Sequence, residues 1–339
     1  MRYFLISLIA TAAASAQPIP LDSLAQSALE DGALPSLVVG IVVEGERFVV
    51  GVGGAKDGAA PDEDTIYEIG SISKVLTSLA LAEAVTRGDL DLEDPVAVLL
   101  PKTRRVGAHP DGPVRLVDLA THTSGLPRMA ANAFARADVM NPFSLYDAGL
   151  LYDFLEDARP ATPPGQRYEY SNAGAGLLGF ALARDAGRSY ADVVRDRVLD
   201  PLGLEDTFVD VPRALEDRFV EGYDAQDRTT PRWTFLEPTV GAGGWRSTAA
   251  DLLTLAQAAL DPDATPLADA IRLSLEPRVE VGDGRTVGLG WHLVPVGSSS
   301  MAVHDGGTGG FASFLGVLPD QGAAVVILTT KRADVIELG

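Results

Sequence analysis

Stretches with the composition of β-strands lie near both ends of this chain, and the long part between them has the pattern of helices. Residues 36–43 and 47–52 are rich in valine and isoleucine and are joined by a Glu-Gly-Glu turn. Further strands are expected towards the C-terminus at 278–281, 287–293, 301–304, 311–318 and 323–329. The simplest architecture pairs the two ends in one antiparallel sheet flanked by helices, which predicts an α+β fold with a second, mostly helical lobe.

The spacing of apolar residues predicts the helices. They are expected at 21–31, 71–87, 114–121, 145–158, 171–187, 190–198 and 251–259. Thr248 and Asp251 have the spacing of a capping box ahead of the last one. The expected sheet lobe covers about 17–70 and 245–339, and the expected helical lobe about 71–244, within one domain spanning 17–339. A ligand site is expected where the lobes meet.

The first sixteen residues have the pattern of a secretory signal peptide. Arg2 is followed by a short apolar stretch at 4–13, and Ala14-Ser15-Ala16 is a small-residue cleavage site. We therefore expect a protein that is cleaved after Ala16 and is periplasmic or secreted. No later stretch has transmembrane length. The chain has no cysteine, which excludes disulfides and lipid attachment at a cysteine, so no membrane anchor is expected.

The charge of the chain is strongly negative. The formal net charge is −20, from 47 acidic and 27 basic residues. Nucleic acids and anionic membrane surfaces are poor partners for such a field. We expect a monomer that acts on a small-molecule substrate.

The segment Ser71-Ile72-Ser73-Lys74 opens the expected helix at 71–87. Because residues three apart share a face of a helix, the Ser71 hydroxyl and the Lys74 amine can meet. A lysine can take the proton of a serine and activate it as a nucleophile once burial or nearby positive charge lowers the pKa of the lysine. The same residues also fit an ordinary helix start, with Ser71 as N-cap and Lys74 in solvent.

Two further segments carry polar groups beside glycines. In Tyr170-Ser171-Asn172, the phenol of Tyr170 can relay a proton and the amide of Asn172 can bind a substrate carbonyl. The alternative is a tyrosine packed on the core beside a helix cap. In His304-Asp305-Gly306-Gly307, between two expected strands, the glycines let a substrate approach and leave N–H groups free for an oxyanion. The alternative is a glycine-rich hairpin.

Together, Ser-x-x-Lys, Tyr-x-Asn and His-x-Gly in this order resemble the serine β-lactamase superfamily, and most closely its class C-type branch of β-lactamases, DD-peptidases and β-lactamase-like esterases. Segments 67–74, 119–127, 164–172, 201–204 and 242–248 are also similar to that family. The resemblance covers about residues 20–330 and implies the β-lactamase/transpeptidase-like fold. It also implies an exported serine hydrolase that forms an acyl-enzyme on an ester, amide or β-lactam bond, with no cofactor and no metal. The substrate could also be peptidoglycan-like.

The resemblance implies a role for each motif residue. Ser71 would be the acylated nucleophile, Lys74 its base or proton relay, and Tyr170 a second general acid and base. Asn172 would position the substrate amide. The N–H groups of Ser71 and Gly307 would form the oxyanion hole, with His304 and Gly306 beside them at the third motif.

Two features depart from the family pattern. Class C β-lactamases usually carry Lys-Thr-Gly at the third motif, where this chain has His304-Asp305-Gly306. A histidine there is typical of DD-peptidases and esterases, and Asp305 would oppose a substrate carboxylate. Members commonly end in a long helix on the sheet, whereas only 331–339 follow the last expected strand.

Other classes of function fit the sequence less well. A Ser-His-Asp hydrolase is disfavoured because there is no Gly-x-Ser-x-Gly, and His122 is expected to be a structural loop residue. A metallohydrolase lacks paired ligand motifs. The alternatives that stay open are a D-Ala-D-Ala-type peptidase and a non-catalytic binding protein on the same fold.

Overall fold

The computed structural model describes residues 20–31, 34–54, 58–135 and 137–331. The expected signal peptide at 1–16 and the residues from 332 onwards lie outside this range. The division into one domain with two lobes stays a prediction. No helix within the described ranges is long and apolar enough to cross a membrane.

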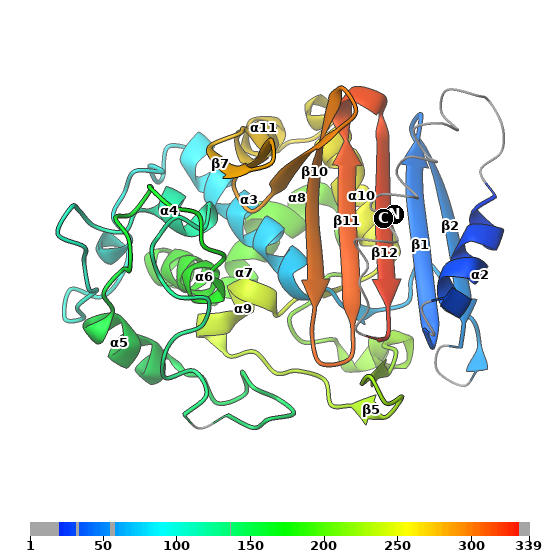
Figure 1. Ribbon diagram of the computed structural model, residues 1–339, viewed down its shortest axis with the longest axis horizontal. Helices are drawn as coiled ribbons and strands as arrows, with labels where there is room; N and C mark the ends of the chain where they lie inside the picture. Colours follow the sequence, from blue (N-terminus) through cyan, green and yellow to red (C-terminus); the bar gives the residue numbers. More distant parts are fainter. Residues whose placement is uncertain (1–19, 32–33, 55–57, 136, 332–339) are drawn as a thin grey trace.

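An eight-stranded antiparallel sheet joins the two ends of the chain, as the sequence predicts (Figure 1). Its order is β2-β1-β12-β11-β10-β9-β8-β7, so β1 from the N-terminal part lies between β2 and the last strand. The strands of the sheet are β1 (Ser36–Val43), β2 (Glu46–Gly53), β7 (Val279–Gly282), β8 (Arg285–Val287), β9 (His292–Val296), β10 (Ser299–Gly307), β11 (Ala312–Leu318) and β12 (Ala323–Thr329). Short pairs join β3 (Tyr67–Glu68) to β6 (Arg246–Ser247) and β4 (Gly222–Tyr223) to β5 (Thr229–Thr230).

Alternate side chains of β1 enter different cores, because successive residues of a strand point to opposite faces. Val38 and Val42 belong to the large core that includes helix α10 (Ala249–Leu260). Leu37, Val39 and Ile41 belong to a second core that includes helix α2 (Leu21–Asp31) on the other face. Both faces of β1 are therefore buried, which explains its unbroken run of apolar residues.

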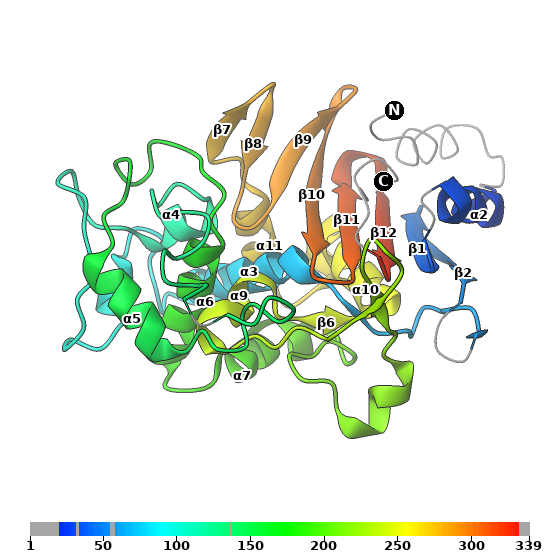
Figure 2. The same ribbon diagram turned by 60° about the horizontal axis from the view of Figure 1, so that its bottom comes forward.

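Helix α3 (Ser73–Thr86) runs between the sheet and the helical part of the molecule (Figures 1 and 2). Nearly all of its residues are buried, and it contacts α6, α9 and α11. The remaining helices are α4 (Leu116–Ala120), α5 (Ala148–Asp157), α6 (Asn172–Ala186), α7 (Tyr190–Val194), α8 (Asp200–Leu202), α9 (Glu237–Gly243) and α11 (Ala268–Leu275). Helices α4, α5, α6 and α7 lie close to the predicted positions, and α7 runs on into a π-helical turn at Arg195–Leu199, whereas α8, α9 and α11 are not among the predicted helices.

The expected strand at 287–293 is wrong. The chain leaves the sheet after Val287 and returns at His292. A Cβ on Gly288 would lie 2.4 Å from the Ser274 carbonyl oxygen, and one on Gly290 would lie 2.7 Å from the Lys74 oxygen. These glycines let the bend between β8 and β9 pack directly on neighbouring backbone, which interrupts the strand.

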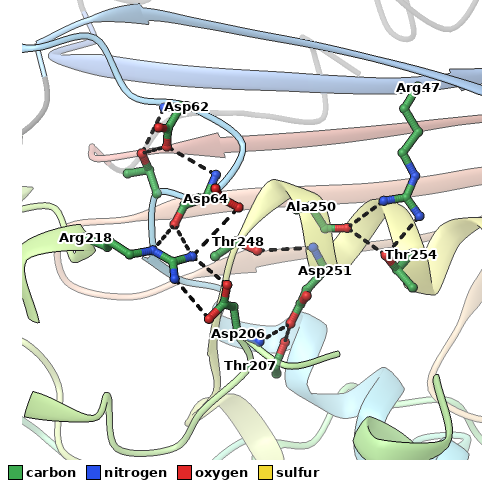
Figure 3. Close-up of polar contacts among 11 residues, drawn as sticks. Arg47, Asp62, Asp64, Asp206, Thr207, Arg218, Thr248, Ala250, Asp251 and Thr254 are labelled. Atoms are coloured by element: carbon green, nitrogen blue, oxygen red, sulfur yellow. Dashed lines mark hydrogen bonds and ion pairs between the residues drawn. The ribbon is translucent and has the colours of Figure 1, made fainter. Parts of the chain in front are cut away.

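The expected capping box at Thr248 forms only in part. Thr248 Oγ1 accepts from the backbone N–H of Asp251, as an N-cap does. The carboxylate of Asp251 instead accepts from Thr207 and from the N–H of Asp206 (Figure 3). In the same network Arg218 pairs with Asp206 and donates to the Asp64 carbonyl. These bonds tie α10 to the segment that leads into β3.

Candidate active site

Ser71 lies in a 3-10 turn, Gly70–Ile72, that leads directly into α3. The expectation that Ser71 begins the α-helix itself is therefore off by two residues, although positions i and i+3 also share a face in a 3-10 turn. The chain before Ser71 is held from both sides. The N–H of Ile69 donates to Trp245, and the Ile69 oxygen accepts from the hydroxyl of Ser313 on β11. Ser71 itself is half-buried at this fixed position.

Lys74 is only 2% exposed, and its Nζ lies 2.9 Å from Ser71 Oγ. The same nitrogen donates to the Ala242 oxygen at 2.5 Å. Burial first, and then the charge of Arg128, lower the pKa of Lys74 to about 7, against the opposing charge of Asp305. A neutral amine can therefore form near pH 7 and accept the Ser71 proton. This geometry contradicts the ordinary-helix reading, in which Lys74 is in solvent.

The phenol of Tyr170 reaches the same serine. Tyr170 hydrogen-bonds with Ser71, and Lys74 Nζ lies 4.9 Å from the centre of its ring. Burial raises the pKa of Tyr170, so the phenol stays protonated at neutral pH. Ser71, Lys74 and Tyr170 therefore lie together, with one group that can take a proton and one that can give it.

Asn172 lies at the start of α6, two residues after Tyr170, but does not reach Lys74 by any hydrogen bond among the described residues. Its Nδ2 donates to Met129 Sδ at 3.5 Å. Its Oδ1 is buried and has no partner within that set. Asn172 therefore carries a buried acceptor that the described part of the chain leaves unpaired.

The glycines of the third motif lie against the backbone that carries Ser71. A Cβ on Gly70 would lie 2.5 Å from Gly307 N, and one on Gly306 would lie 2.1 Å from the Ile69 oxygen. Gly70 also has a φ of +50°, which favours glycine. Only residues without side chains allow this approach, which brings the backbone beside Ser71 next to the backbone of Gly307.

His304 is 1% exposed, and its ring centre lies 6.4 Å from that of Tyr170. Its Nδ1–H donates to the Asp305 oxygen at 2.7 Å, because a carbonyl can only accept. Its Nε2 is buried and finds no partner in the described ranges. Burial, followed by the nearby His292, holds the pKa of His304 well below its usual value. The third motif therefore presents a neutral imidazole where class C β-lactamases usually carry a lysine.

Three further aromatic residues, His122, Tyr168 and His292, lie around Tyr170, and only His292 falls outside the segments that are similar to the family. The ring of His122 lies 4.4 Å from that of Tyr170, and His292 lies 6.3 Å away and hydrogen-bonds with Tyr168 at 2.8 Å. His122 Nδ1 accepts from the backbone N–H of Ser171, which agrees with a structural role for His122. These histidines form no group that could hold a metal ion within the described part of the chain.

Arg128 is the other site residue that sequence reasoning missed. It is exposed, and its Cζ lies 4.9 Å from the centre of the Tyr170 ring. Arg128 directly follows Gly125-Leu126-Pro127, a segment already similar to the family, but that pattern does not show that the guanidinium turns towards Tyr170.

A sheet-and-helix fold that brings a serine, a buried lysine and a tyrosine into contact defines a serine hydrolase of the serine–lysine type. The chain belongs to the beta-lactamase family, whose sequence model matches residues 21–335. Its relatives place it in the class C-type branch of the serine β-lactamase superfamily, as the motifs predict.

Relatives span nearly the whole chain. It is 28% identical to a beta-lactamase of Pseudomonas fluorescens, over 92% of each chain. It is also 28% identical to the D-alanyl-D-alanine-carboxypeptidase/endopeptidase AmpH of Escherichia coli K12, over 86% of this chain and 78% of AmpH. The crystal structure of a class C beta-lactamase from Rhodobacter sphaeroides superposes with a TM-score of 0.81 at 28% identity, covering 96% of each chain. These findings confirm the predicted superfamily, fold and enzyme class.

Proposed function

We propose that the protein hydrolyses an ester, amide or β-lactam bond through an acyl-enzyme on Ser71. The observation that carries the proposal is the 2.9 Å contact between Ser71 Oγ and the buried amine of Lys74. A neutral Lys74 takes the Ser71 proton as Oγ attacks the substrate carbonyl. The N–H groups of Ser71 and Gly307 bind the oxyanion, and the position of Ser71 just ahead of a helix N-terminus favours the negative charge.

Collapse of the tetrahedral intermediate breaks the bond to the leaving group. Tyr170 gives its proton to the leaving nitrogen or oxygen and regains one from protonated Lys74, so the proton lost by Ser71 leaves with the product. In deacylation, water attacks the ester, Tyr170 and Lys74 carry its proton to Ser71 Oγ, and the acid product departs. Asn172 Oδ1 accepts the N–H of a substrate amide, and Gly306 lets the substrate lie close to β10.

A D-Ala-D-Ala-type peptidase is the second candidate. The neutral His304 supports it, because the lysine usual in class C β-lactamases is absent, and AmpH among the relatives is named as such a peptidase. A non-catalytic binding protein is the third, although Ser71, Lys74 and Tyr170 are all present and in contact. We also propose that the protein is exported with cleavage after Ala16, which N-terminal sequencing of the mature chain tests. We propose further that it acts as a monomer without a membrane anchor.

A covalent-labelling experiment tests the acyl-enzyme. Fluorescent penicillin and a fluorophosphonate probe should give a covalent adduct on Ser71 that is absent in Ser71→Ala. Lack of labelling by both reagents in folded protein contradicts an enzyme. Comparison of kcat/KM for nitrocefin, short p-nitrophenyl esters and a D-Ala-D-Ala peptide then ranks the substrate classes.

A further inference from the structure

Arg128 is a cation in the active site without a carboxylate partner among the described residues. Its guanidinium lies over the Tyr170 ring, 4.9 Å from the ring centre, and its side chain is exposed. Its charge acts on Lys74, where it is the largest cause of the lowered pKa after burial. Several described arginines have no carboxylate partner, but Arg128 is the one that lies over Tyr170, where its guanidinium is available to a substrate anion.

The backbone of Arg128 is fixed to the segment that carries Tyr170. The Pro127 oxygen accepts from Ser171 Oγ at 2.7 Å. The Arg128 oxygen accepts from the N–H groups of Asn172 at 2.9 Å and Ala173 at 3.3 Å. Arg128 and Tyr170 are therefore held as one unit, and the guanidinium is presented to the site from a rigid base, which reduces the entropic cost of binding.

The third motif offers no positive charge that could bind a substrate anion in place of Arg128. His304 Nδ1–H is used by the Asp305 oxygen, and its Nε2 is a free acceptor, so the ring is neutral. Asp305 is exposed, and its negative charge acts on Lys74, Tyr170 and His292. A substrate anion is therefore repelled by Asp305 and attracted by Arg128.

We propose that Arg128 binds a carboxylate of the substrate, an inference that rests on the function proposed above. Substrates then enter with this carboxylate on the Arg128 side of Tyr170 and away from Asp305. A guanidinium holds a carboxylate through two parallel hydrogen bonds, which a lysine cannot match. The site then selects acyl compounds that carry a carboxylate, with selectivity supplied by the loop after Gly125 rather than by β10.

The test uses two esters that differ by one carboxylate, p-nitrophenyl acetate and mono-p-nitrophenyl succinate. Arg128→Gln should lower the succinate-to-acetate ratio of kcat/KM by about tenfold or more, mainly through KM, because a charge-assisted contact is lost. Arg128→Lys should restore part of the ratio. The matched control is Arg104→Gln, because Arg104 is also exposed and lies 4.5 Å from the centre of the Tyr152 ring outside the site. This variant should leave both rates unchanged.

A pH profile of kcat/KM tests whether Arg128 acts in the site through its charge or only supports the local structure. Arg128→Gln should move the acid limb of kcat/KM for the acetate ester to higher pH, and Asp305→Asn should move it to lower pH, because the two charges act on Lys74 in opposite senses. A purely structural defect would lower the rate without moving the limb.

The binding of inhibitors that are not turned over tests the role of Arg128 independently of the proposed hydrolase activity. Phenylboronic acid and 3-carboxyphenylboronic acid should differ in Kd for the wild type, in favour of the carboxylate, and this preference should vanish in Arg128→Gln. No preference in the wild type, or one that survives the substitution, overturns the role of Arg128. Loss of all ester turnover and of all Ser71 labelling instead overturns the proposed function.

Discussion

At the scale of single residues, the burial of the Lys74 amine matters most for function, because it changes the pKa of that amine. The amine is buried beside two oxygens, Ser71 Oγ and the Ala242 carbonyl, and no carboxylate of the described residues is hydrogen-bonded to it. Burial therefore favours the neutral form. The folded protein binds fewer protons at Lys74 than the unfolded chain between about pH 7 and the usual lysine pKa of about 10.4, so Lys74 makes stability rise with pH across that window.

Lys74→Met should remove the base while keeping the shape of the side chain. We expect Ser71 labelling to slow by about three orders of magnitude or more, as when one member of a catalytic unit is removed. Stability at pH 7 should not fall, because the buried amine is replaced by an apolar group. Labelling rates and thermal unfolding measure the two effects. An unchanged labelling rate would reject the role of Lys74.

The rate of the wild type should depend on pH through the same amine. For a neutral ester, kcat/KM should rise as pH increases through about 7 and then level off, because only neutral Lys74 accepts the Ser71 proton. Deprotonation of Tyr170 should not end this plateau below the usual tyrosine range of about pH 10, since its pKa is raised. An acid limb of kcat/KM with its midpoint near pH 4 or 5 would instead point to a carboxylate base.

Sequence reasoning identified the residues whose contacts are local. Ser71 and Lys74 are three residues apart, so a helical pattern alone predicts that they meet. That the N–H groups of Ser71 and Gly307 share one oxyanion hole is implied by the family resemblance and not by spacing. Arg128 and His292 reach Tyr170 from separate segments, and no local pattern records on which side of a loop or bend a side chain points.

At the scale of elements, the ends of α6 agree with the sequence because local capping residues set them, whereas the bend between β8 and β9 depends on distant contacts of two glycines. α6 begins after Ser171, whose hydroxyl accepts from Gly174, and ends at Gly187 in the left-handed region, so both ends follow known local chemistry. The bend between β8 and β9 was missed because Gly288 and Gly290 serve close packing on distant backbone. A sequence shows a glycine but not the atom that approaches it.

Asp251 on α10 should make stability depend on pH. Burial raises the pKa of Asp251 to about 6, so the folded state binds a proton that the unfolded chain has released between about pH 4 and pH 6. This residue therefore lowers stability as pH rises through that window. Asp251→Asn should remove about 2–3 kcal/mol of that fall. Denaturant unfolding of both proteins at pH 4 and pH 7 measures the difference. Equal pH dependence in the two would contradict the assignment.

At the scale of the whole molecule, the net charge of −20 opposes the approach of anions. Salt screens this long-range repulsion. In Arg128→Gln, kcat/KM for the succinate ester should therefore rise between about 0.01 and 0.5 M NaCl, and that for the acetate ester should not. The wild type should show a smaller rise, because salt also weakens the contact with Arg128. A fall for the succinate ester in the variant would show that the global field does not govern approach.

The position of β1 also constrains the order in which the chain can fold. Val43 pairs with Ala323, so the strand made early must wait for the strand made last before the sheet can close. Until then the inner edge of the β1–β2 hairpin carries unpaired backbone groups and can join other chains. Non-local pairing of this kind slows folding. This edge of the sheet therefore stays open in the nascent chain until β12 has been synthesised.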